Sequence, residues 1–129
     1  MNQFTVETGS RTDFINIDRS VEDVIRKSGF TDGILTVFIP HTTAGITINE
    51  NADPDVLADM EQVLDSVVPW NDGYRHCEGN TAAHMKTSMM GSSVQVAVEN
   101  GDLQLGTWQS LFLCEFDGPR SRKVWVKGI

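Results

Sequence analysis

The stretch Ile34-Leu35-Thr36-Val37-Phe38-Ile39 decides the fold class, because it is the clearest buried β-strand of the sequence. It is rich in β-branched residues, which favour strands, and its continuous apolar character predicts a place in the core. Pro40 ends it. The alternating segment Ile46-Thr47-Ile48 then predicts a second strand close behind the first.

More strands are predicted on both sides of this pair. Other short segments alternate or carry large apolar residues in the manner of strands: 4–8, 14–17, 94–98, 103–105, 111–116 and 123–127. Asn100-Gly101 is a strong hairpin signal between two of them, and Asp117-Gly118-Pro119 predicts a turn between the last two. The chain is therefore expected to be rich in β-structure.

Helical features occur in three segments: 21–28, 54–67 and 81–90. Ser20 is expected to cap the first, and Gly29 to end it. Asp53-Pro54 is a good start for the second, and Asn80 or Thr81 for the third. Many strands and about three helices, without regular βαβ alternation, predict an α+β fold with mixed or antiparallel sheets.

Length and charge narrow the class of protein. The 129 residues fit a single domain spanning 1–129. The net charge of −8 argues against general binding to nucleic acid or to an anionic membrane. No apolar run is long enough to cross a bilayer, and residues 1–5 lack the start of a signal peptide. With two cysteines no disulfide framework is expected, so the expected compartment is the cytoplasm.

The three histidines are the first candidates for chemistry. His41 follows the core strand, His76 lies in a polar loop, and His84 lies on the helix after that loop. Neutral imidazole is the commonest metal ligand, and three of them leave a position open for water or substrate. The sequence thus predicts that they converge. The alternative is three unrelated polar histidines, each held by a hydrogen bond.

Carboxylates and an amide extend this set. Glu50 borders the second strand and has no evident structural task, so it is a candidate general base or metal partner. Asp53, by contrast, is explained as a helix cap. Glu115 is the other candidate carboxylate. Asn80 and His84 are four residues apart and therefore share one helix face.

Some residues have the chemistry to recognise a ligand. Trp108, at the polar start of a hydrophobic strand, either stacks on a flat ring or only packs. Arg120 lies in a turn and can fork onto phosphate, although a solubilising loop is the simpler account. Lys86 would add positive charge near His84. No Walker loop, dinucleotide loop, CxxC pair or GxSxG elbow occurs, which argues against those classes of site.

Taken together, the motifs resemble the YjbQ-type family, also labelled secondary thiamine-phosphate synthase. The matching blocks occur in the family's order: His41-Thr42-Thr43-Ala44-Gly45, Asn49-Glu50-Asn51 with Asp53-Pro54, Tyr74 with His76, Asn80 to His84 with Lys86, Ser88-Met89-Met90-Gly91, Gly106-Thr107-Trp108-Gln109, and Glu115 to Arg120. They cover most of the chain from Leu35 onward. The N-terminal third resembles the family only in pattern.

The resemblance implies a compact α+β homotrimer whose pocket unites His41, His76 and His84, often with an anion or a divalent metal such as zinc or magnesium. It also implies a weak thiamine-phosphate synthase activity. In that transfer a pyrimidine methyl diphosphate alkylates the nitrogen of a thiazole phosphate and releases pyrophosphate. Glu50 would join the histidines as a catalytic group. The expected ligand contacts are Arg120, Lys86, Asn80, Trp108 and Gln109.

Two other functions stay open at this point. The first is a metal-dependent hydrolase, whose metal-bound water attacks a phosphorylated or amide metabolite. The second is a non-catalytic trimer that binds a metal or a phosphorylated metabolite. A chelator should abolish hydrolase activity, whereas a binding protein should show ligand-dependent melting shifts without turnover.

Overall fold

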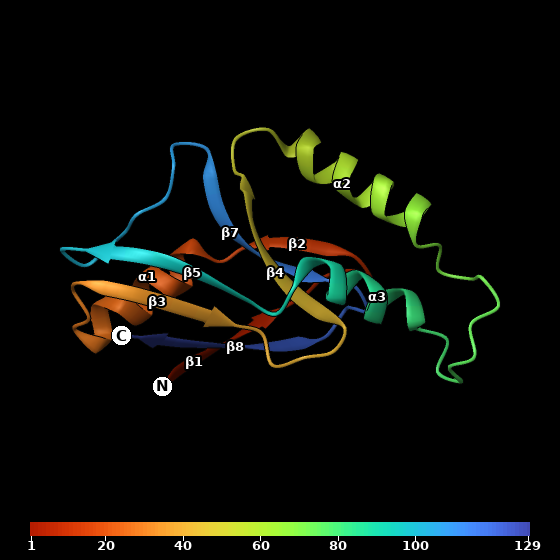
Figure 1. The fold of residues 1–129 in the computed structure, drawn as a ribbon, viewed down its shortest axis with the longest axis horizontal. Helices are drawn as coiled ribbons and strands as arrows, with labels where there is room; N and C mark the ends of the chain where they lie inside the picture. The colour runs from red at the N-terminus through yellow and green to blue at the C-terminus, as the bar shows by residue number, and fades with distance from the viewer.

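Two antiparallel sheets form the body of the molecule, which the computed structural model describes from residue 1 to residue 129 (Figure 1). The strands are β1 (Asn2–Glu7), β2 (Asp13–Asn16), β3 (Gly33–Phe38), β4 (Ala44–Glu50), β5 (Ser93–Glu99), β6 (Asp102–Leu103), β7 (Gln109–Glu115) and β8 (Ser121–Gly128). The helices are α1 (Asp18–Ser28), α2 (Pro54–Val67) and α3 (Thr81–Met90). The α+β prediction with antiparallel sheets and three helices is confirmed.

The larger sheet has five strands in the order β1-β8-β3-β5-β6, and the smaller has three in the order β2-β7-β4. Asn100 and Gly101 both have positive φ and form the predicted hairpin between β5 and β6. In the smaller sheet, Ala44 pairs with Glu115 at one end and Glu50 with Gln109 at the other. This register fixes which candidate residues can meet.

The main core lies between the two sheets and α1. It holds 14 buried residues, including Leu35 and Val37 of β3, Ile46 of β4 and Leu113 of β7. β3 alternates, because Leu35 and Val37 are buried whereas Ile34 is 45% exposed on the outer face. The strand expected to be buried throughout is therefore covered on one side only, as is usual for a sheet with one solvated face.

The helix boundaries agree with the sequence except at the first helix. α1 begins at Asp18 rather than at the predicted 21, because the Val21 N–H already donates to the Ile17 carbonyl (3.1 Å). Ser20 is thus inside the helix and does not cap it. Gly29 ends α1 in the left-handed conformation (φ 73°), as predicted. α2 begins as predicted, with the Asp53 carboxylate accepting from the Asp55 N–H (2.9 Å).

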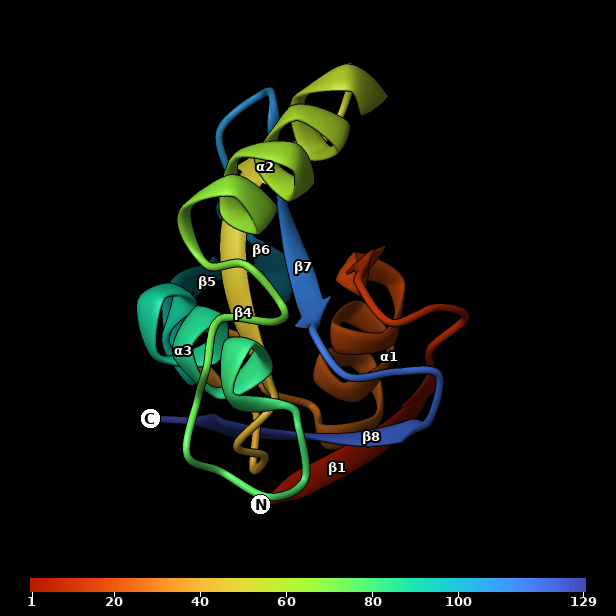
Figure 2. The same ribbon diagram turned by 90° about the vertical axis from the view of Figure 1, so that its right-hand side faces the viewer.

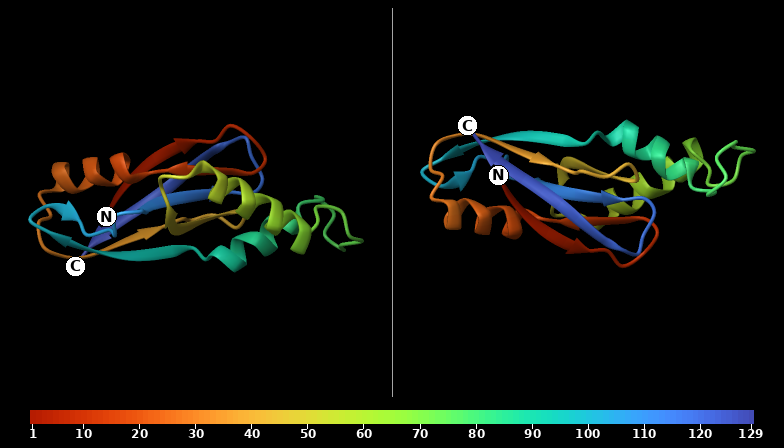
Figure 3. Two further views of the ribbon diagram at one scale, coloured as in Figure 1. Left: turned by 90° about the horizontal axis from the view of Figure 1, so that it is seen from above. Right: turned by 90° about the horizontal axis from the view of Figure 1, so that it is seen from below.

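α2 and α3, with the loop between them, project from one end of the body (Figure 3), and Figure 2 shows this end facing the viewer. A small second core joins them to β7, with Leu64, Ala83, Cys114 and Phe116 buried in it. Burial raises the pKa of the Cys114 thiol to about 12, which agrees with its predicted packing role. Leu64 is the only buried residue of α2. No helix is long and apolar enough to span a membrane.

Candidate functional site

An open polar depression of about 570 Å³ lies where β3 leads into β4 and the β7–β8 turn approaches. Arg120 and Arg122 are its cationic side chains, and His41 contributes an imidazole ring. Its lining consists of Phe38, Ile39, Pro40, His41, Thr42, Thr43, Ser92, Arg120 and Arg122. We call it the His41 depression. It combines His41 and Arg120, which the sequence placed among the site residues.

His41 is held by the backbone of the neighbouring strand. Its Nε2 accepts a hydrogen bond from the Lys123 N–H at 2.9 Å. Burial and the positive charge of Arg122 lower the pKa of His41, and Arg120 and Lys123 act in the same direction, against Glu115. The imidazole is therefore favoured in its neutral form.

A buried ion pair underlies the depression. Arg122 of β8 is 2% exposed and donates from Nε to Glu115 Oε1 (2.8 Å) and from Nη2 to Glu115 Oε2. The same Nη2 donates to Thr43 Oγ1 (2.8 Å) and to the Thr43 carbonyl (3.2 Å). The pair thus connects the two sheets and fixes the segment after His41.

Glu115 is fully buried, with 0% exposure. Burial alone would raise its pKa, but hydrogen bonds from Arg122, the Asp117 N–H and Thr8 more than offset this effect, so the pKa of Glu115 lies below its ordinary value. A buried carboxylate with a lowered pKa, whose two oxygens already accept hydrogen bonds, is unsuited to work as a general base. The structure therefore gives Glu115 a structural role.

Hydrogen bonds lead from this ion pair to the start of α3. Thr8 Oγ1 donates to Glu115 and accepts from the Arg120 N–H at 2.9 Å. Arg120 in turn donates to the Asp117 carbonyl (2.9 Å) and to its carboxylate (3.0 Å). Asn80 Nδ2 donates to the same Asp117 carboxylate at 2.9 Å. Asn80 thus stands at the N-cap position but bonds across to the β7–β8 turn instead of capping α3.

His76 and His84 form a separate pair. Their rings meet edge to face, with centroids 5.4 Å apart and an interplanar angle of 88°. His76 lies in the loop before α3, and its Nε2 is 3.9 Å from Glu78 Oε2, with both side chains largely exposed. The structure therefore brings two of the three histidines together, and the convergence of all three stays a prediction.

The predicted metal site needs three ligands close together. No three His, Cys, Asp or Glu side chains of the chain are grouped so that they could hold a metal ion. The Nε2 lone pair of His41 is engaged by Lys123, and the rings of His76 and His84 lie against each other, with Glu78 3.9 Å from His76. The residues of one chain do not form a three-histidine metal centre, and the expected zinc or magnesium stays a prediction.

Glu50, Trp108 and Gln109 lie away from the His41 depression. Glu50 pairs with Gln109 at the end of the smaller sheet opposite to Ala44 and Glu115, six residues along β4 and roughly 20 Å away at about 3.3 Å per residue. Gln109 Oε1 accepts from the Gly106 N–H (2.8 Å), and Trp108 is 62% exposed. Within one chain these residues do not meet His41.

Lys86 also points away from the histidines. It is two positions after His84, on the opposite side of α3. It is 3% exposed and pairs with Asp65 of α2. It borders another polar depression, where the Arg11 guanidinium lies 4.1 Å from the centre of the Trp70 ring. Within one chain Lys86 therefore faces Asp65 and not the histidines, and its expected contact with a ligand stays a prediction.

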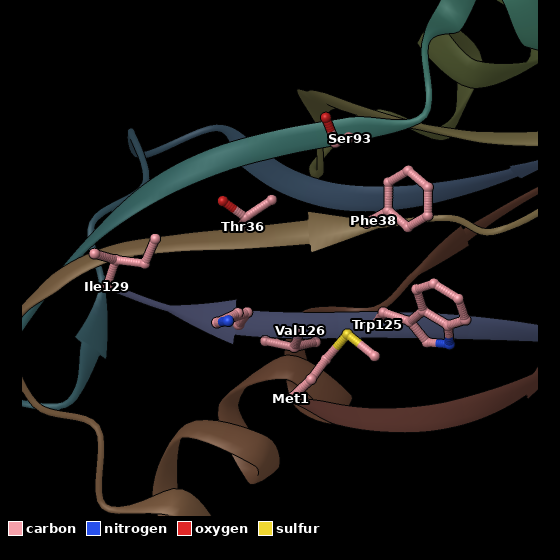
Figure 4. Close-up of a pocket in the computed structure, with 8 residues that line it drawn as sticks. Met1, Thr36, Phe38, Ser93, Trp125, Val126 and Ile129 are labelled. Carbon is pink, nitrogen blue, oxygen red and sulfur yellow. The ribbon is translucent and has the colours of Figure 1, made fainter.

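A further hollow, of about 300 Å³, lies on the outer face of the larger sheet (Figure 4). Phe38 and Trp125 stand side by side there, with ring centroids 5.6 Å apart, and Met1 and Ile129 border them. Lys127 is its only titratable side chain. Most of its lining is apolar, so it offers a surface for an apolar group.

Arg122 and Thr43 were missed as site residues. A signal for Arg122 existed, because Arg122, Val124 and Val126 alternate on the inner face of β8. Glu115 shares a strand face with Leu111 and Leu113 in the same way. A charged residue at an inward position of each of two strands indicates a buried pair, since a lone buried charge is costly.

The chain matches, over residues 2–129, the model of the family described as "UPF0047 protein YjbQ-like". It is 54% identical over 123 residues to the UPF0047 protein YugU of Bacillus subtilis, which covers 95% of this chain and 93% of YugU. It is 43% identical over 125 residues to the UPF0047 protein MJ1081 of Methanocaldococcus jannaschii, covering 97% and 91%.

A solved structure is similarly close. The crystal structure of a conserved YjbQ/UPF0047 family protein from Clostridium acetobutylicum has a TM-score of 0.96 and 53% sequence identity, with 100% of both chains covered. The descriptions of these relatives give the family and no activity.

Proposed function

We propose that the His41 depression binds the phosphate of a small metabolite in the cytoplasm. The chain belongs to the YjbQ-like UPF0047 family. We further propose that the reaction is that of a thiamine-phosphate synthase-like transferase. A hydroxymethylpyrimidine diphosphate would condense with a thiazole phosphate and release pyrophosphate. The observation that carries the proposal is the placement of His41, Arg120 and Arg122 around one depression.

The charge around the depression supports an anionic ligand. The whole chain carries −8, yet Arg120, Arg122 and Lys123 all act on His41. Glu115 neutralises Arg122, and Asp117 takes two bonds from Arg120. The Arg120 side chain is 49% exposed, so its guanidinium is both oriented and accessible. An oriented arginine at an open surface is suited to bind phosphate.

The chemistry of the proposed transfer needs such a group. When diphosphate leaves the pyrimidine methyl carbon, negative charge grows on the leaving oxygens, and preorganised donors lower the barrier by stabilising that charge. Arg120 is preorganised by Asp117, and Asp117 by Asn80. In this proposal Asn80 positions Arg120 through Asp117 and is not itself a ligand contact.

The proposal is tested by thiamine phosphate formation from the two phosphorylated precursors. Magnesium is added because diphosphates are commonly bound as magnesium complexes. We compare wild type with Arg120→Met, and with Lys27→Met on exposed α1 as the matched control. We expect Arg120→Met to lose at least about tenfold in kcat/KM and the control to match wild type.

Equal traces of product from wild type and Arg120→Met would contradict the proposal. A phosphoester panel with and without chelator then tests the hydrolase alternative. Melting shifts without turnover would indicate a binding protein. His84→Ala, in the same assay, tests whether the His76–His84 pair takes part.

We also propose that the chain works as a homotrimer, with α2 at a contact between copies. α2 projects from the body and buries only Leu64. Val63 and Val67 on it are 59% and 64% exposed, and Met85 and Met89 of α3 are 51% and 45% exposed. Such apolar exposure is typical of an interface. Sedimentation of Val63→Asp should show dissociation, whereas Trp125→Lys on the outer sheet face should leave the mass unchanged.

A further inference from the structure

We infer that His41 is a neutral hydrogen-bond donor, which presents Nδ1–H to an oxygen of the bound anion and is not a metal ligand. The inference rests on the proposed phosphate site and specifies how that site recognises its ligand. It also departs from the metal role that the family resemblance implies for this residue. His41 would be a binding residue for an oxyanion, with Arg120 as its charged neighbour.

The first step is the protonation state of the His41 ring. A backbone N–H is always a donor, so the Lys123 N–H requires a lone pair on His41 Nε2. In a neutral imidazole one nitrogen carries the proton and the other accepts. With Nε2 accepting, the proton lies on Nδ1. A protonated imidazolium would place two N–H groups against each other, and the depressed pKa of His41 agrees with the neutral form.

The second step is that the two segments joined by the His41–Lys123 hydrogen bond are both held in place. Lys123 follows Arg122, which is locked to Glu115. Thr43, two residues after His41, accepts from the same Arg122. One buried guanidinium therefore sets the positions of both the donor and the acceptor of the His41–Lys123 bond. The tautomer is a consequence of the fold.

The third step is the choice of ligand. With Nε2 occupied and Nδ1 protonated, His41 has no lone pair to offer a metal ion. Arg120 also lines the depression, and with two of its five N–H donors bonded to Asp117 it can donate further bonds to an anion, which a cation could not accept. A group rich in acceptor oxygens satisfies both Nδ1–H and Arg120. Phosphate and diphosphate belong to this class.

Two substitutions separate the two ring nitrogens. The amide nitrogen of Asn reaches about as far as Nδ1 and can donate to the anion, whereas the amide of Gln reaches about as far as Nε2 and can accept from Lys123. His41→Asn should therefore keep pyrophosphate binding within about threefold of wild type. His41→Gln should weaken it by at least about tenfold, as expected for losing a hydrogen bond to a charged group.

The decisive experiment is long-range ¹H–¹⁵N NMR of the histidine rings in the full protein, with pyrophosphate as the probe. Three histidines give few signals, and the His41 signals are those lost in His41→Asn. We expect a protonated Nδ1 and an unprotonated Nε2. We also expect a shift of the Nδ1–H signal when pyrophosphate is added, and no change of His41 when zinc is added instead.

The outcomes separate the inference from the proposed function. A proton on Nε2, or a zinc-dependent shift of His41, would overturn the inference while pyrophosphate binding could still stand. A protonated Nδ1 with no response of any signal to pyrophosphate would overturn both, since no anion would bind. Tight binding by His41→Gln together with loss in His41→Asn would also overturn the inference, because Nε2 would then be the recognising atom.

Discussion

The His41 end of the molecule and the α2–α3 end hold their candidate residues in different ways. At the His41 end, a buried ion pair connects the two sheets and fixes His41, Thr43 and Arg120 through a continuous set of hydrogen bonds. At the α2–α3 end, His76 and His84 contact each other on an exposed loop and a helix face. The first arrangement is complete within one chain, whereas the α2–α3 end leaves large apolar residues in solvent.

The largest difference should follow from breaking the ion pair. Arg122→Met leaves the carboxylate of Glu115 buried without its partner, so we expect the free energy of unfolding to fall by about 3–5 kcal/mol. The matched control is Arg26→Met, which breaks an exposed pair with Asp23 and should cost less than about 1 kcal/mol. Urea denaturation measures both. Equal losses would show that the buried pair does not hold the two sheets.

A smaller loss is expected from crowding the turn above the pair. A Cβ added to Gly118 would stand 2.3 Å from the Ser10 carbonyl oxygen and 2.8 Å from Thr8 Oγ1. Gly118→Ala should therefore cost about 1–3 kcal/mol, as overpacking does. Gly9→Ala is the control, because its Cβ would meet only Asp13 Oδ2 at 3.6 Å. Thermal melting that is unchanged in both variants would show that the turn yields freely.

The stability that the buried ion pair gives to the His41 end should depend on pH. The folded pKa of Glu115 lies below its ordinary value of 4.5, so the unfolded chain binds the proton more readily. The resulting stability is fully present above pH 4.5 and is lost as the pH falls through the folded pKa. Urea midpoints measured across this range should therefore fall more steeply in wild type than in Glu115→Gln. Parallel curves would contradict the assigned charge.

The smallest effect on stability is expected from a substitution at the α2–α3 end. His76→Ala removes an exposed ring that lies against His84 and is 3.9 Å from the Glu78 carboxylate. Stability should change by less than about 0.5 kcal/mol, as for most surface substitutions. If denaturation instead shows a loss comparable to that of Arg122→Met, the α2–α3 end is tied to the body more firmly than its contacts indicate.

The sequence predicted local structure well where a short-range rule applies. Asp53 before Pro54 placed the start of α2, Gly29 placed the end of α1, and Asn100-Gly101 placed a hairpin. These signals depend on neighbouring residues, so no knowledge of the fold was needed. Ser20 failed as a cap, because a helix can start without a side-chain cap when its backbone bonds are already in place.

The candidate site, unlike the helix ends and the hairpin, depends on contacts between residues that are far apart in the sequence. The sequence by itself determined the α+β class, the family and the reactive residue types, because alternation, turn chemistry and ordered motifs are properties of the chain. Only the tertiary structure decided which of them meet. Strand pairing placed Glu50 and Gln109 at one end of a sheet and Glu115 at the other, and the packing of two sheets brought Arg122 to Glu115 and Lys123 to His41. Contacts between residues about 80 positions apart depend on register and sheet packing, which no local pattern encodes.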